Sequence, residues 1–164
     1  MTTQFNIEVR CSVCGMVNNA WFIGSYSTRG VMMTGAPRFL GLSPLGCEIQ
    51  RCAGCGYCSW DLSDPLDLSP HILETDGYRT ALRRDGEHGA LAFLLSQRGD
   101  HRGAALMYLH GAWIEDEMWL NEEYEVLPWR DEIETPLSYE ERKKRRDFNL
   151  IHRLAARRLR TLSI

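Results

Sequence analysis

The pattern of hydrophobic and polar positions changes character near residue 61. Before it, short apolar runs alternate with turns rich in Gly, Pro and Cys, and residues 18–27 and 45–52 are typical of strands. Residues 29–46 indicate an ordered loop between them. After residue 62, apolar positions recur at helical spacing. The pattern predicts an α+β fold, with a β module over 1–62 and a helical region over 63–164.

The helical region opens with a short helix and a helical hairpin. Ser69 and Pro70 predict a helix start, with an interruption near Gly77. Residues 89–118 predict two helices separated by Gly99-Asp100, with Asp100 as the N-cap of the second. The small residues of this hairpin have the spacing of one tetratricopeptide unit. An ordinary antiparallel helix pair is the alternative interpretation.

A third, basic helix is predicted at the C-terminal end. Ser138 and Glu141 have capping-box spacing, and apolar residues continue on one face to about residue 162. The pattern therefore predicts a long helix over about 138–162.

Six cysteines suggest the chemistry of the β module. Cys11-x-x-Cys14 and Cys52-x-x-Cys55 are each followed by Gly. In such a turn two sulfurs point at one ion, and the Gly takes the positive φ that closes the turn. Two such knuckles supply the four thiolates of a closed structural Zn²⁺ site. The sequence predicts a zinc-ribbon-like module with Zn²⁺ on Cys11, Cys14, Cys52 and Cys55.

The module departs from the usual ribbon in its spacing, because 37 residues separate Cys14 from Cys52. Cys47 and Cys58 are expected to be small, partly buried packing residues. Two alternatives stay open. Cys52, Cys55 and Cys58 have spacing that resembles an iron–sulfur motif, and Cys47, Cys58 and His71 could form a second zinc site.

Charge and composition narrow the classes of partner. The net charge of −3 gives no overall attraction to nucleic acid, and no stretch approaches the roughly 20 apolar residues of a membrane span. Residues 111–134 hold nine acids and one base, whereas 138–164 hold nine bases and three acids. The lack of an apolar stretch of that length and an N-terminus unlike a signal peptide predict a cytoplasmic protein; in the cytoplasm thiols stay reduced, and clustered cysteines more often bind metal than form disulfides.

Candidate catalytic residues are few. None of the five histidines belongs to an H-E-x-x-H motif, and the sequence has no G-x-S-x-G or phosphate-binding glycine motif. His110 lies beside an apolar helical face and is expected to be a structural imidazole. A Cys₄ zinc site keeps no open coordination position. We therefore expect a non-enzymatic protein.

Residues 8–120 resemble an uncharacterised bacterial family, a domain of unknown function with two cysteine knuckles and tetratricopeptide-like helices. The likeness rests on Cys52, Cys55-Gly56-Tyr57 and the later Gly99-Asp100, Ala104-Ala105 and Ala112-Trp113. Ser12 and Ala53 replace the prolines of the family's knuckles. The resemblance implies the same four cysteine ligands and leaves the activity open.

The sequence thus favours a zinc-binding, non-catalytic adaptor that contacts another protein. Candidate contact residues are the aromatic side chains Trp113, Trp119, Tyr124 and Trp129. The alternatives are an iron–sulfur or redox protein and a nucleic-acid-binding ribbon. The ribbon would use Arg29, Arg38, Arg51 and Arg142–Arg146.

Overall fold

The computed structural model describes residues 3–32, 35–40 and 43–120, with side chains described as far as residue 114. The predicted helix over 138–162, its capping box and the basic segment Arg142–Arg146 lie outside the described residues. The described part is α+β, with small antiparallel sheets and two long helices, as predicted.

Three hairpins make up the β part. They are β1 (Thr3–Arg10) with β2 (Val17–Ser25), β3 (Thr28–Val31) with β4 (Pro37–Phe39), and β5 (Gln50–Arg51) with β6 (Cys58–Ser59). A short 3₁₀ helix, η1 (Pro44–Cys47), leads into β5. Strand β2 falls where residues 18–27 predicted one. The expected loop over 29–46 contains the β3–β4 hairpin, which the sequence reading missed.

The register of β1 and β2 explains which of their side chains reach the core. Val9 lies opposite Asn18, and Ile7 lies opposite Ala20, so these four side chains share one face of the hairpin. Val9, Asn18 and Ala20 are buried, whereas Ile7 is 40 % exposed. The hairpin therefore packs on the core mainly through the half that carries the first cysteine turn.

The helical part consists of η2 (Pro70–Glu74), α1 (Asp76–Gln97) and α2 (His101–Leu120). The interruption predicted near Gly77 occurs at Thr75, which separates η2 from α1 and caps α1 by accepting a hydrogen bond from the Tyr78 backbone N–H. Ser69 makes no capping hydrogen bond. Asp100 caps α2 as predicted, since its Oδ1 accepts from the Gly103 N–H at 2.8 Å.

Gly86 divides α1 into two segments that fold back on each other. Its φ of 64° and ψ of −156° lie in a region that only glycine adopts readily. The rings of Tyr78 and Phe93 are 6.1 Å apart. In a straight helix, 15 residues would separate them by about 22 Å. The sequence reading missed this turn.

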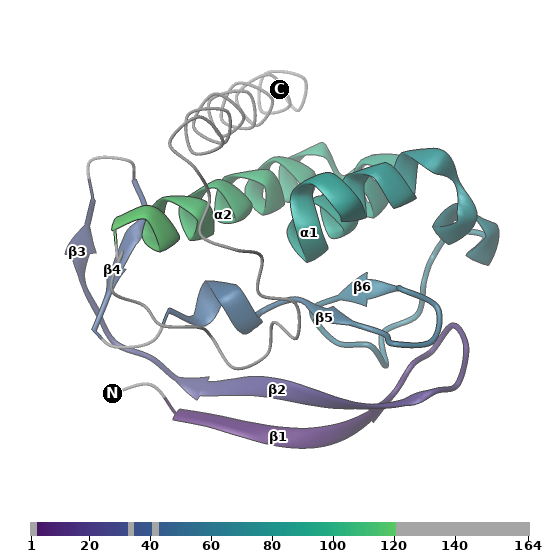
Figure 1. Cartoon of the computed structure of the whole chain (residues 1–164), viewed down its shortest axis with the longest axis horizontal. Coiled ribbons are helices and arrows are strands. Elements are labelled where there is room, and N and C mark those ends of the chain that lie inside the picture. The colour runs from purple at the N-terminus through teal and green to yellow at the C-terminus, as the bar shows by residue number, and fades with distance from the viewer. Residues whose placement is uncertain (1–2, 33–34, 41–42, 121–164) are drawn as a thin grey trace.

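The elements form layers, with the β1–β2 hairpin on one side, η1 and β5–β6 in the middle, and α1 and α2 on the other side (Figure 1). The main core joins Val9 and Cys52 to Leu91 and Leu94, so both parts of the chain contribute. A smaller cluster joins Ala36, Leu45 and Trp113. Within the described residues, no helix is long and apolar enough to cross a membrane.

Candidate metal centre

The two cysteine turns have the same backbone geometry. The Gly15 N–H donates to the Cys11 carbonyl at 2.8 Å, and the Gly56 N–H donates to the Cys52 carbonyl at 2.9 Å. Gly15 and Gly56 both have a φ of 74°. A side chain at either position would strain the turn. The prediction that these glycines close the knuckles with positive φ is confirmed.

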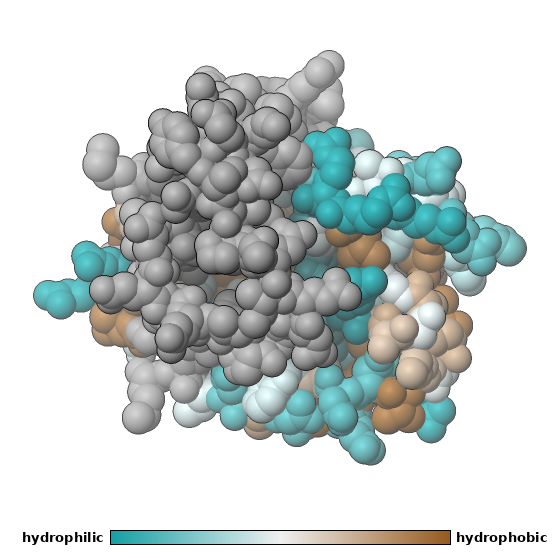
Figure 2. Space-filling view, viewed as in Figure 1, coloured by the Kyte–Doolittle hydropathy of each residue, from teal (hydrophilic) through white to brown (hydrophobic). Residues whose placement is uncertain are grey.

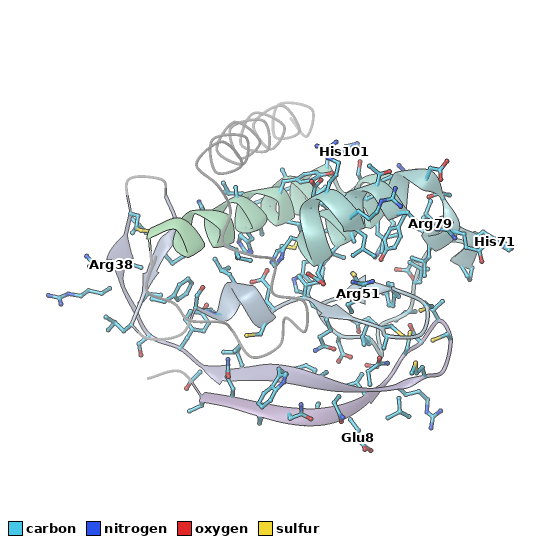
Figure 3. The ribbon with its side chains drawn as sticks, viewed as in Figure 1. Glu8, Arg38, Arg51, His71, Arg79 and His101 are labelled. Carbon is cyan, nitrogen blue, oxygen red and sulfur yellow. The ribbon has the colours of Figure 1, made fainter. Side chains whose placement is uncertain are left out.

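The four predicted cysteines gather into one group at the end of the molecule where the β1–β2 and β5–β6 turns meet, and the sulfur atoms there are visible in Figure 3. The Sγ atoms of Cys14 and Cys52 lie 3.5 Å apart, and those of Cys11 and Cys55 lie 3.7 Å apart. A tetrahedral ion with Zn–S bonds of about 2.3 Å places neighbouring sulfurs about 3.8 Å apart. The described geometry is therefore compatible with one metal ion bound by both knuckles.

The knuckle backbone favours a thiolate at Cys52. Burial alone would raise the pKa of this thiol, but the backbone N–H groups of Cys55 and Gly54 and the thiol of Cys14 donate to it, and its pKa falls to about 6. Burial raises the pKa of Cys11 and of Cys55. Metal ligands must be deprotonated, so the turn stabilises the charge that an ion requires.

Asn18 links the two knuckles and was missed by the sequence reading. Its side-chain oxygen accepts from the Ala53 N–H at 2.9 Å, and its amide nitrogen donates to the Met16 carbonyl at 3.0 Å. The same nitrogen lies 3.6 Å from the Cys52 sulfur. Partners of this kind orient metal ligands. The one signal available was a polar residue at an inward position of a predicted strand.

The connector after β6 and helix α1 hold the knuckles from the other side. The Ser12 N–H donates to the Leu62 carbonyl at 2.9 Å, and the Ser12 hydroxyl donates to the Asp64 carbonyl at 2.6 Å. The Tyr78 hydroxyl donates to the Gly56 carbonyl at 2.7 Å. Tyr78 is 1 % exposed. The second knuckle is therefore fixed directly to the helical part.

Cys47 and Cys58 do not belong to the four-cysteine group. Cys58 is fully buried, its thiol lies 3.5 Å from the Gly56 carbonyl, and burial raises its pKa to about 12. Cys47 is partly buried and receives a hydrogen bond from the Gln4 amide at 3.5 Å. The geometry fits the expected packing roles. Cys47, Cys58 and His71 do not form a metal-binding group among the described residues.

A second group of potential ligands was not predicted. Glu48 follows η1, His88 lies in α1 just after Gly86, and His110 lies in α2. One ligand atom from each lies within 4.8 Å of the others. Burial raises the pKa of Glu48, but its hydrogen bond with His110 and the nearby imidazole of His88, 3.8 Å away, outweigh burial and lower the pKa to about 2. No local motif marks this group, because its members are 22 residues or more apart.

Comparison of the chain with protein-family models, curated proteins and solved structures finds no match. The resemblance to the bacterial knuckle family stays a prediction.

Proposed function

We propose that this protein binds one Zn²⁺ through Cys11, Cys14, Cys52 and Cys55, and that this ion has a structural role. The convergence of four thiols from two identical turns carries the proposal. Four thiolates leave a tetrahedral ion no open position, which is typical of structural sites. In zinc-finger peptides such binding contributes about 10–16 kcal/mol of apparent free energy.

The ion would tie together segments that have few other direct links. The first knuckle follows β1 and the second follows β5. Among the described residues, the side chain of Asn18 is hydrogen-bonded to both, and Ser12 joins the first knuckle to the connector after β6. The second knuckle in turn contacts α1 through Tyr78. Zinc at this place would hold the β1–β2 hairpin on the rest of the fold, as in a zinc ribbon with an enlarged middle.

We further propose that the zinc-stabilised module is a non-catalytic adaptor that contacts another protein. Several large apolar side chains of the β1–β2 hairpin remain exposed, namely Phe5 at 49 %, Ile7 at 40 % and Trp21 at 49 %. Met16 and Val17, at the turn of the β1–β2 hairpin, are about half exposed. Figure 2 shows hydrophobic side chains at the surface among hydrophilic ones. Phe5 and Ile7 lie on the face of the hairpin that carries Val9, and Trp21 lies on the other face. This number of large exposed apolar side chains on one hairpin supports its assignment as the contact surface.

The candidate contact residues need one correction. Trp113, named above as a candidate contact residue, is 8 % exposed and packs in the smaller core cluster, so it does not reach a partner. The side chain of Trp119 is not described, and Tyr124 and Trp129 lie outside the described residues. The contact surface is therefore assigned to the β1–β2 hairpin.

The arrangement of the arginines does not favour nucleic acid as the partner. Arg38 lies at the β3–β4 end of the molecule and Arg51 lies in its middle, well apart in Figure 3. Nucleic-acid binding needs several bases along one surface. Among the described residues, these two do not form such a surface.

Metal analysis tests the zinc site. We expect the purified full chain to hold zinc, and Cys55→Ser to lose the equivalent of one ion. Cys47→Ser is the matched control, because Cys47 lies outside the group. Equal metal content in Cys55→Ser and the wild type would contradict the four-cysteine site.

Cross-linking in cell extract tests the adaptor role. We expect the wild type to cross-link to a protein partner that Trp21→Ser loses, whereas Asn19→Ser, on the same face of β2, retains it. If the wild type and both variants gave identical cross-linked species, the assignment of the contact surface to the β1–β2 hairpin would be wrong.

A further inference from the structure

Glu48, His88 and His110 meet where three elements converge. Glu48 Oε1 lies 2.8 Å from His110 Nδ1 and 3.8 Å from His88 Nε2. With metal–ligand bonds of about 2.0–2.1 Å, neighbouring donors of a tetrahedral site lie about 3.3 Å apart. The two distances bracket this value, so small side-chain rotations would place all three atoms around one ion.

His88 supplies the second observation. The residue is 7 % exposed, and its buried Nε2 has no hydrogen-bond partner. Buried polar atoms are almost always paired, and an exception needs a reason such as an ion. The carboxylate oxygen Glu48 Oε1 lies 3.8 Å from this nitrogen, so an ion between the two groups would give the nitrogen a partner.

The packing holds both imidazoles in position. A Cβ added at Gly111 would lie 3.4 Å from the His88 Cβ, so this glycine lets α1 and α2 approach closely at the site. The His110 ring stacks on Trp113 with centroids 5.3 Å apart. Donors fixed on packed helices form a more rigid site than donors on loops.

A cavity of about 390 Å³ lies next to the group, and Glu48 and His110 line it. The rest of the wall is largely aromatic, with Trp21, Phe22, Phe39 and Trp113. The buried indole N–H of Trp113 also lacks a hydrogen-bond partner.

We propose that Glu48, His88 and His110 form a second metal site, which binds a divalent transition metal and leaves one coordination position facing the aromatic cavity. Two imidazoles and one carboxylate suit zinc and its neighbours in the first transition row. Three protein ligands, unlike four cysteines, leave a position for water or a small oxygen ligand. This site goes beyond the structural zinc role and does not depend on it.

The number of zinc ions per chain tests the proposal. The full chain is saturated with Zn²⁺, freed of loosely bound metal by gel filtration and analysed by mass spectrometry. We expect two zinc ions in the wild type and one in Glu48→Gln and in His110→Gln. Loss of one ligand should weaken the second zinc more than about 100-fold, since loss of an outer partner alone costs about 10–100-fold. His71→Gln, whose imidazole points into solvent (Figure 3), should keep two.

Cobalt substitution separates this site from the cysteine site. Only the cysteine site gives a thiolate-to-cobalt charge-transfer band, and the band should persist in both variants. If the variants lose this band as well, the number of zinc ions bound per wild-type chain becomes the test. A single zinc ion per wild-type chain at saturation would reject the second site. Two zinc ions retained in both variants overturn it too. A missing thiolate band together with zinc loss on His110→Gln would leave this site standing and reject the cysteine site.

Discussion

The side-chain oxygen of Asn18, in strand β2, accepts a hydrogen bond from the backbone N–H of Ala53, inside the second cysteine turn, at 2.9 Å. Asn18 is 9 % exposed, so replacement by an apolar residue leaves its partners buried and unpaired. We expect Asn18→Leu to lower the free energy of unfolding by about 1–3 kcal/mol. It should also weaken zinc binding about 10–100-fold, measured by competition with a chelating dye.

Asn19→Leu is the matched control for Asn18→Leu. Asn19 is exposed on the opposite face of β2, so the same change there should leave zinc affinity within experimental error. If both substitutions weakened zinc binding equally, the effect would come from a general change in strand β2 and not from loss of the Asn18 hydrogen bonds.

Metal removal should loosen the knuckles before the helices. Among the described residues, the direct polar links between the two turns are the thiol contacts and the hydrogen bonds of Asn18. We expect a chelator to speed hydrogen exchange of the Gly15 and Gly56 amides at least about tenfold, because the free energy of local opening falls when the metal is removed. The Ala104 amide, which donates to Asp100 in the first turn of α2, should change little. Uniform acceleration at all three amides would contradict a local role for the metal.

Tyr78→Phe should show how much helix α1 stabilises the second knuckle independently of the metal. The substitution removes the 2.7 Å hydrogen bond to the Gly56 carbonyl and preserves the ring contact with Phe93. We expect a loss of about 1–2 kcal/mol in urea unfolding, with zinc still bound. Tyr26→Phe, at a 54 % exposed position, should have no measurable effect.

Gly86→Ala should strain the turn inside α1. Its φ of 64° and ψ of −156° cost a residue with a Cβ about 1–3 kcal/mol, although nothing lies within 4 Å of the added atom. Gly46→Ala is the control, since its Cβ also meets open space and its φ is not positive. Thermal unfolding should therefore shift for Gly86→Ala and stay nearly unchanged for Gly46→Ala.

Local spacing predicted the four-cysteine group, because each C-x-x-C-G turn is specified by five consecutive residues. The capping role of Asp100 was predictable for the same reason. Gly86 could not be distinguished from a tolerated helical glycine, because its turn depends on Phe93 packing back on Tyr78. His110 was expected to be a structural imidazole, since nothing near it in sequence indicates Glu48 or His88. Their proximity results from tertiary packing alone.

The distance along the chain between the two knuckles has a consequence for how this protein can vary. An ion on Cys14 and Cys52 closes a loop around the 37 residues between them. The entropy of closing a flexible loop grows only with the logarithm of its length, so doubling it costs about 0.6 kcal/mol. The cross-link therefore tolerates insertions and deletions in the same segment that supplies Glu48 and much of the cavity wall. A chain altered in that segment would have a different cavity wall while its two cysteine turns stay unchanged.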